Sequence, residues 1–213
     1  MSTILLIRHG ETAWNAVRRL QGHIDIDLNE EGLRQAAALG RALAAEPLDA
    51  IVSSDLKRAQ QTAQAIAAHH ELPLHTDPGL RERAYGAFEG LLYTEIAERY
   101  PEDFADWQAR KVETVMPAGG RLAESFHQFY DRCVAGLVRW AGKHPGQTIA
   151  VVAHGGVLEC AYRAATGMSL DSPRNFQVKN ASINRFTFEN GRLLLRQWGE
   201  VAHLQPATLD DIV

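Results

Sequence analysis

Two apolar runs that each end in a His-Gly pair constrain the fold of this 213-residue chain most strongly. The first covers residues 3–7 and leads into Arg8 and His9, and the second covers residues 148–153 and leads into His154. Short apolar runs of this kind are typical of strands buried on both faces of a sheet. If the two strands lie side by side and parallel, both histidines emerge at one sheet edge, where ligands bind in open α/β sheets.

The pattern between residues 4 and 70 alternates strand-like and helix-like segments, which predicts βαβ units with a parallel sheet. One helix is expected to carry an apolar stripe that begins at Leu33, and Ser54 or Asp55 is expected to cap the next. Near the end of the chain, an Asn-Gly pair at residues 190–191 predicts a hairpin with a type I′ turn. We therefore expect an α/β fold, a three-layer αβα sandwich whose mostly parallel central sheet has an antiparallel hairpin at one edge.

Length and composition indicate a single globular domain over residues 1–213, with 46% hydrophobic and 23% charged residues. The net charge of −4 offers no basic field for nucleic acid, and no apolar segment reaches membrane-spanning length. Two isolated cysteines and no signal-peptide pattern favour a cytoplasmic location, and the oligomeric state stays open between monomer and homodimer. The looser pattern at about residues 84–120 predicts an insertion over the sheet edge, which is a candidate lid.

A phosphomonoester is a dianion, so a site that acts on it needs cationic donors, a nucleophile and a proton donor. Arg8 and Arg58 can each offer a planar fork of N–H groups to phosphate oxygens. A neutral imidazole can attack phosphorus near neutral pH, and spacing alone leaves open whether His9 or His154 does so. A carboxyl group must then protonate the leaving oxygen and later activate water.

Several motifs accompany the two His-Gly units, and together they resemble the histidine phosphatase superfamily, which includes the cofactor-dependent phosphoglycerate mutases and many small phosphatases. The motifs are residues 8–12 (Arg-His-Gly-Glu-Thr), 53–59 (Ser-Ser-Asp-Leu-Lys-Arg-Ala), 80–82 (Leu-Arg-Glu) and 154–156 (His-Gly-Gly). The resemblance covers almost the whole chain, from residue 4 to about residue 204. It implies a phosphoglycerate mutase-like fold and a small phosphorylated substrate.

The resemblance also implies roles for individual residues. His9 would be the nucleophile that forms a phosphohistidine, His154 would support it, and Glu82 would be the acid, with Glu11 and Glu89 as alternatives. The predicted catalytic residues are His9, Glu82, Arg8, Arg58 and His154, and the predicted substrate- or phosphate-binding residues are Arg8, Asn15, Gln21, Gly22, Arg58, His154 and Gly155. No metal ligand and no cofactor are predicted.

Other functions agree less well with the sequence than a phosphatase does. Zinc hydrolysis is disfavoured because there is no His-Glu-x-x-His motif and two arginines would repel the cation. A non-catalytic phospho-ligand binding module would have lost the nucleophile or the acid, and both are present. Residues 81–86 resemble the corresponding segment of a phosphoglycerate mutase, an enzyme that would need 2,3-bisphosphoglycerate for priming. A mutase should, however, have a larger basic insertion, whereas residues 113–124 hold one Arg and no Lys. We therefore predict a phosphomonoester hydrolase that acts on small phosphorylated metabolites.

Overall fold

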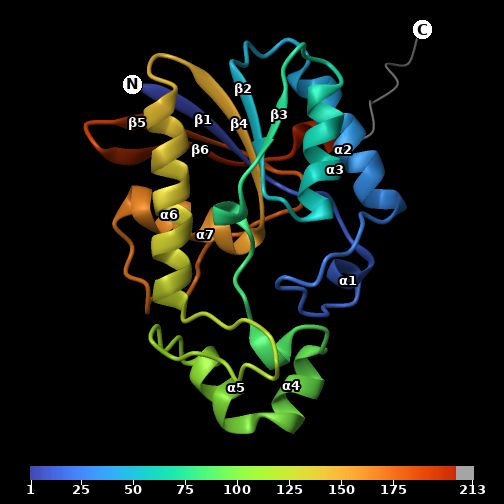
Figure 1. The fold of residues 1–213 in the computed structure, drawn as a ribbon, viewed down its shortest axis with the longest axis vertical. Coiled ribbons are helices and arrows are strands. Elements are labelled where there is room, and N and C mark those ends of the chain that lie inside the picture. The colour runs from blue at the N-terminus through green and yellow to red at the C-terminus, as the bar shows by residue number, and fades with distance from the viewer. Residues whose placement is uncertain (205–213) are drawn as a thin grey trace, which may run out of the picture.

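The computed structural model describes residues 1–204, and its six strands form one mixed sheet in the order β3-β2-β4-β1-β5-β6 (Figure 1). The pairs β1–β4, β4–β2 and β2–β3 are parallel, whereas β5 is antiparallel to both of its neighbours, β1 and β6. The strands are β1 (Ser2–Arg8), β2 (Ala50–Ser53), β3 (Leu74–Thr76), β4 (Thr148–Ala153), β5 (Ile183–Glu189) and β6 (Arg192–Glu200). The predicted antiparallel edge is confirmed, and Asn190 and Gly191 in its turn both have positive φ, as a type I′ turn requires.

Helices cover both faces of the sheet, so the predicted three-layer αβα sandwich is confirmed (Figure 1). Helices α2 and α3 pack on one face and α6 and α7 on the other, whereas α4 and α5 lie beyond the end of the sheet. The helices are α1 (Ala13–Ala16), α2 (Glu30–Leu43), α3 (Lys57–Ala67), α4 (Tyr93–Arg99), α5 (Pro101–Gln108), α6 (Phe126–Lys143) and α7 (Gly155–Thr166), with single 3-10 turns at Pro78–Leu80, Gly86–Phe88 and Ala202–Leu204. Within residues 1–204, no helix is long and apolar enough to cross a membrane.

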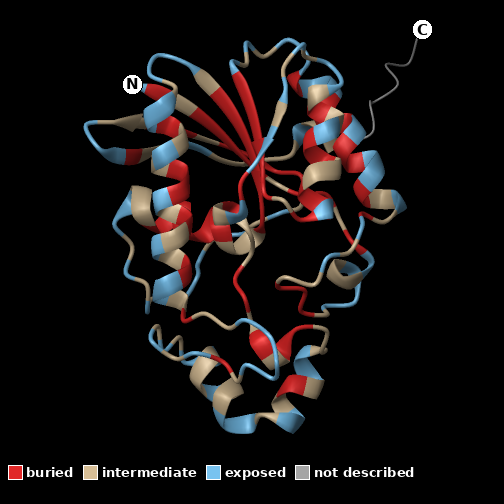
Figure 2. Cartoon of the chain, in the orientation of Figure 1, coloured by how far each residue is buried: buried red, intermediate tan, exposed pale blue. Residues whose placement is uncertain are grey.

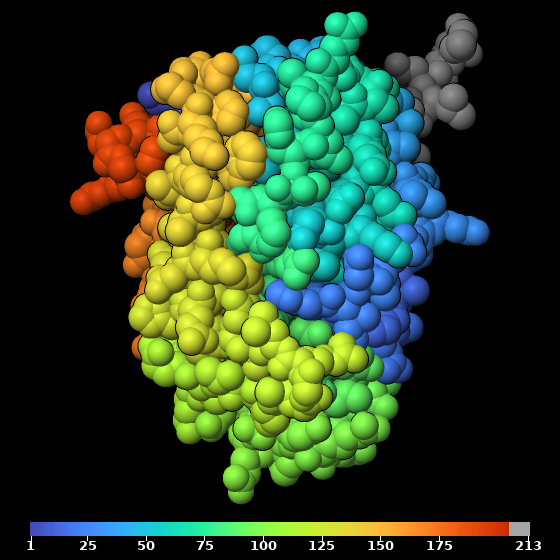
Figure 3. All heavy atoms as spheres, viewed as in Figure 1, coloured from blue at the N-terminus to red at the C-terminus, as the bar shows by residue number. Residues whose placement is uncertain are grey.

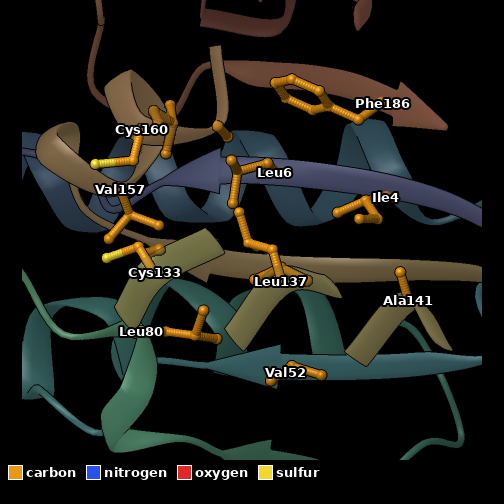
Figure 4. Close-up of a cluster of buried hydrophobic side chains, with 14 of the residues drawn as sticks. Ile4, Leu6, Val52, Leu80, Cys133, Leu137, Ala141, Val157, Cys160 and Phe186 are labelled. Carbon is orange, nitrogen blue, oxygen red and sulfur yellow. The ribbon is translucent and has the colours of Figure 1, made fainter. Parts of the chain in front are cut away.

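Side chains alternate along β1 between two apolar layers, because successive residues of a strand point to opposite faces. Ile4 and Leu6 lie in the layer under α6 and α7, where Leu137 also packs (Figure 4). Leu5 lies in the opposite layer with Leu39 of α2. Figure 2 shows that buried residues fill the central strands and line the inward faces of these helices. The strand is therefore buried on both sides, which explains its unbroken apolar sequence.

The insertion between β3 and α6 has a small apolar cluster of its own. Phe88, Ile96 and Met116 are buried there together with Leu20 from the loop after β1. Trp107 of α5 packs against this cluster, with its ring centroid 5.9 Å from that of Phe88 and the two ring planes tilted by 52°. The cluster therefore joins the insertion to the loop after β1, beyond the carboxyl ends of the parallel strands (Figure 1).

Two local expectations are wrong. Leu33 does not begin the buried stripe of α2, because it is 52% exposed, whereas Ala36, Gly40 and Leu43 of the same predicted stripe are buried together with Leu39. Neither Ser54 nor Asp55 caps α3: Leu56 occupies the N-cap position and makes no side-chain hydrogen bond there. The rotation of α2 is set by its packing on α3 and the sheet, which periodicity in a single helix does not define.

Leu39→Ala should lower the free energy of unfolding by about 2–5 kcal/mol, because it empties a fully buried position between α2 and the sheet. Leu33→Ala on the same helix is the matched control and should change that free energy by no more than about 0.5 kcal/mol. Urea titrations followed by circular dichroism measure both values. Equal losses at the two positions would contradict the observed rotation of α2.

Candidate active site

A cavity of about 800 Å³ lies where β1 and β4 end, between the sheet and the insertion. In the space-filling view, the loop after β1 and the insertion meet beyond this end of the sheet (Figure 3). Among the predicted site residues, only His154 does not line the cavity. Those that line it are Arg8, His9, Asn15, Gln21, Gly22, Arg58, Glu82 and Gly155.

The register of β1 on β4 brings the two histidines together. Arg8 lies opposite Ala153 in the parallel ladder, and the backbone N–H of His9 donates to the carbonyl of Ala153 at 3.0 Å. The ring centroids of His9 and His154 are consequently 5.2 Å apart, although the residues are far apart in the sequence. His154 is fully buried next to His9 and is not among the residues that line the cavity.

His9 is held as a neutral imidazole with a defined tautomer. Its Nδ1 lies 2.7 Å from the carbonyl of Gly10, which only accepts hydrogen bonds, so Nδ1 carries the proton and Nε2 keeps a free lone pair. Burial, followed by the charges of Arg58 and Arg8, lowers the pKa of His9 well below its ordinary value. A neutral ring with an unprotonated nitrogen is the form that can attack phosphorus.

His154 is also neutral, and Ser54 is its side-chain partner. Ser54 Oγ lies within hydrogen-bond distance of His154 Nε2, at 2.8 Å, and accepts the backbone N–H of Leu56 at 3.4 Å. The other ring nitrogen of His154, Nδ1, is buried and has no partner among residues 1–204. Burial and the charge of Arg58 lower the pKa of His154 well below its ordinary value. His154 therefore has one unpartnered ring nitrogen beside His9.

Arg8 and Arg58 bring two guanidinium groups to the cavity without a carboxylate partner. Arg8 donates from Nη1 to the carbonyl of Val178 at 2.6 Å, and Arg58 donates from Nη2 to the carbonyl of Gly22 at 2.8 Å. Within the described chain neither forms an ion pair, and the Nε of each is buried without a partner. Burial lowers the pKa of Arg58 to about 10. Because a buried unpaired charge is costly, this pair of cations favours the binding of an anion.

Glu82 reaches the cavity from the turn after β3 and is held through backbone groups. Its Oε1 accepts the N–H of Arg83 at 2.8 Å and its Oε2 accepts the N–H of Gly156 at 3.1 Å. Arg132 of α6 donates to the carbonyls of Arg81 and Glu82, each at 3.1 Å, so it clamps the turn in place. The carboxylate is thereby fixed beside the start of α7.

The alternative acids do not reach the cavity. Glu11 accepts a hydrogen bond from the side chain of Asn29 at 2.8 Å, and Glu89 accepts the backbone N–H groups of His23 and Tyr85, each at 3.0 Å. Neither lines the cavity. Glu89 instead packs under the loop after β1.

Three further predicted residues lie on the cavity wall. Asn15 accepts the backbone N–H of Thr12, the N-cap of α1, at 3.2 Å and so completes the capping box of that helix. Gln21 is buried, with its Oε1 unpartnered among residues 1–204. Gly22 has a φ of +53°, and a Cβ there would lie 2.1 Å from Glu89 Oε1, so no side chain fits.

The sequence analysis missed several residues of this cavity. Ser54 belongs to a recognised motif, but it was assigned to the cap of α3 rather than to His154. Glu159 lines the cavity and its carboxylate is bound by Arg163 at 2.9 Å, a pair whose i,i+4 helical spacing was a usable signal. Arg174 and Tyr93 also line the cavity, and no local motif marks either of them.

The chain belongs to the histidine phosphatase superfamily (branch 1), whose family model matches residues 4–201. It is 40% identical to phosphoglycerate mutase-like protein 4 of Arabidopsis thaliana over 206 residues, which are 95% of this chain and 86% of the relative. It is also 40% identical over 206 residues to the metal-independent phosphoserine phosphatase of that organism, covering 96% of this chain and 84% of the relative. Its fold matches the crystal structure of phosphoserine phosphatase from Entamoeba histolytica in complex with 3-phosphoglyceric acid, with a TM-score of 0.84, 27% identity, and coverage of 96% of this chain and 100% of the other.

These comparisons confirm three predictions: the family, the fold and the class of enzyme. The fold is phosphoglycerate mutase-like, and the protein is a phosphatase of this superfamily. Within residues 1–204, no cluster of three or more His, Cys, Asp or Glu side chains has the arrangement of a metal site.

Gly156→Ala should lower kcat for an alkyl phosphomonoester by about 100-fold, because small displacements of a catalytic group have effects of that size. A Cβ at position 156 would lie 2.2 Å from Glu82 Oε1 and 2.8 Å from the ring of Phe129, so it would push the acid away. Phosphate release under saturating substrate measures kcat. In the control Gly142→Ala, the added Cβ meets nothing within 4 Å, and kcat should not change. Wild-type kcat in Gly156→Ala would contradict the assigned position of the acid.

The free energy of unfolding should fall as the pH drops below about 6.5, the ordinary pKa of histidine. His9 and His154 stay neutral in the folded protein but bind protons in the unfolded chain, so acid favours unfolding. This stability is fully present above that pH and is lost as the pH falls toward the lowered folded-state pKa values. Each histidine contributes a slope of up to about 1.4 kcal/mol per pH unit.

Denaturant titrations at a series of pH values test this dependence. His9→Gln should show a shallower slope than the wild type, because one of the two suppressed protonations is removed. His69→Ala, which changes an exposed histidine at the end of α3, should retain the wild-type slope. Equal slopes in the wild type and His9→Gln would mean that His9 is not held neutral by the fold.

Proposed function

We propose that the protein hydrolyses small phosphomonoesters through a phosphohistidine formed at Nε2 of His9. The observation that carries this proposal is the neutral ring of His9, with its free Nε2 lone pair, in a cavity that it shares with Arg8, Arg58 and Glu82. The two guanidinium groups would bind the equatorial phosphate oxygens, and Nδ1 of His154 would add a further donor.

In the first step, Nε2 of His9 attacks phosphorus and the bond from phosphorus to the ester oxygen breaks. Glu82, protonated at the start, gives its proton to the leaving alcohol oxygen and becomes a carboxylate. In the second step, Glu82 takes a proton from water while the water oxygen attacks phosphorus and the N–P bond breaks. Inorganic phosphate leaves, and His9 and Glu82 return to their initial states.

We further propose that this chemistry needs no metal ion and no cofactor. Arg8 and Arg58 supply the positive charge at the place where phosphate charge develops, which is the part that a divalent cation would otherwise play. The printed name of one relative, a metal-independent phosphoserine phosphatase, supports this proposal. We also propose that the protein is cytoplasmic, that it is a monomer or a homodimer, and that residues 1–213 form a single domain. The insertion is proposed to close over bound substrate.

His9→Ala should abolish the phosphoenzyme that forms when the wild-type protein meets labelled p-nitrophenyl phosphate. Rapid quench followed by acid and alkali treatment should reveal an acid-labile, alkali-stable phosphoryl group in the wild type, which is the behaviour of a phosphohistidine. His69→Ala is the matched control and should label like the wild type. Labelling that persists in His9→Ala, or activity that a chelator abolishes and zinc restores, would overturn the proposal.

Phosphoglycerate mutase activity is the second candidate, and the name of the phosphoglycerate mutase-like relative favours it. A mutase must keep water from the phosphohistidine and return the phosphoryl group to the substrate. The two functions separate when 3-phosphoglycerate is supplied with a trace of 2,3-bisphosphoglycerate as primer. Release of inorganic phosphate supports hydrolysis, whereas rapid isomerisation without phosphate release would establish the mutase.

A further inference from the structure

A second cavity, of about 430 Å³, adjoins the first on the side of the insertion, and we call it the basic chamber. Five residues line both cavities, so the two spaces are contiguous: Tyr85, Tyr93, Gly156, Glu159 and Arg174. The remaining walls come from the end of α5, the start of α6 and the segment before Arg174. Any substrate that enters the first cavity therefore has space to extend into the basic chamber.

The arginines of the basic chamber carry more positive charge than its own carboxylate can balance. Four cationic side chains line it, Arg83, Arg110, Lys111 and Arg174. Lys111 is paired with Asp106 at 2.6 Å, so the three arginines are left with the single lining carboxylate of Glu159. Glu159 is shared by Arg110 at 2.6 Å, the fully buried Arg163 at 2.9 Å and Arg174 at 3.6 Å. One negative charge therefore faces three guanidinium groups.

Arg83 adds a buried cation without a counterion. It is 4% exposed, and its guanidinium donates to the backbone carbonyls of Glu124 at 3.0 Å and Thr114 at 3.2 Å. It forms no ion pair within residues 1–204. Like Arg8 and Arg58 in the first cavity, it leaves an unbalanced charge that an anion would offset.

The basic chamber adjoins Glu82 through the two residues that bind its carboxylate, Arg83 and Gly156. Arg83 follows Glu82 in the chain, and its backbone N–H binds the carboxylate of Glu82 at 2.8 Å. Gly156, which binds the other oxygen of that carboxylate at 3.1 Å, lines both cavities. An alcohol whose oxygen receives a proton from Glu82 would therefore extend from this point into the basic chamber.

We propose that the alcohol part of the substrate carries a carboxylate that binds in the basic chamber, and that Arg174 determines this specificity. The proposal rests on the proposed function, because it takes the phosphate to lie in the first cavity. A planar guanidinium matches a carboxylate through two parallel N–H bonds. Arg83 and Arg110 already use several donors on protein oxygens, and the few that remain suit an anion with two oxygens better than a second phosphate.

Arg174 is the most informative position for a test. Its side chain is 46% exposed and its tie to Glu159, at 3.6 Å, is the longest of the three, so most of its donors remain free. Its replacement removes no buried contact, and the variant should fold. Arg41→Gln, an exposed arginine on α2 remote from both cavities, serves as the matched control.

The test compares substrates that differ in the carboxylate alone or nearly so: O-phosphoserine with O-phosphoethanolamine, and 3-phosphoglycerate with glycerol 3-phosphate. Arg174→Gln should lower kcat/KM for the two carboxylates by about 10- to 100-fold, the range for a hydrogen-bonded charge. It should leave kcat/KM for their two partners within about twofold, a selectivity that a merely structural role would not produce. Arg41→Gln should match the wild type on all four.

Equal losses on all four substrates, or no loss on any, would overturn the proposal. So would an Arg174-dependent preference for fructose 1,6-bisphosphate over fructose 6-phosphate without a carboxylate effect, because the basic chamber would then bind a second phosphate. Labelling of His9 by p-nitrophenyl phosphate, which has no carboxylate, is measured in the same preparations. Labelling of His9 without selectivity for a carboxylate would contradict this inference alone, whereas absence of labelling at His9 would contradict the proposed function.

Discussion

The parallel pairing of β1 with β4 is the contact on which the site depends. Each strand is too short and too apolar to hold its terminal histidine in a defined place by itself. Once Arg8 lies opposite Ala153, the ladder brings the next residue of each strand, His9 and His154, to the same sheet edge. The ring centroids of these two histidines are 5.2 Å apart. Burial of both strand faces fixes this register, because a slip by one residue would turn every apolar side chain toward the wrong helical layer.

Burial then gives the site its electrostatic character. Two guanidinium groups without carboxylates lie beside two imidazoles whose pKa values are held well below the ordinary value, so in the absence of a ligand the cations are unbalanced and the histidines are neutral. A phosphate dianion would offset the charge of Arg8 and Arg58. The same burial that makes the two unpaired cations costly also keeps the ring of His9 neutral.

Much of the fold could be predicted from the sequence because its strands are buried on both faces and therefore read as unbroken apolar runs. The αβα layers and the Asn-Gly hairpin follow from such local signals. Leu33 shows their limit: helical spacing grouped it with Leu43, which is buried, but the packing of α2 on α3 and the sheet leaves Leu33 exposed. Ser54 fails in a similar way, since its local role as a cap competes with its distant contact to His154.

For the site, the sequence by itself was enough to predict that His9, Arg8 and Arg58 gather in one place, because they stand in recognisable motifs beside strand ends. The sequence also favoured Glu82 over Glu11 and Glu89 as the acid, but only the tertiary structure decided that Glu82 alone of the three lines the cavity, because its hydrogen-bond partners hold it there. The tertiary structure alone revealed Arg174, which no motif marks. The physical reason is distance along the chain. Strand and turn propensities act over a few residues, whereas ion pairs and the hydrogen bonds that position a side chain form between segments that only folding brings together.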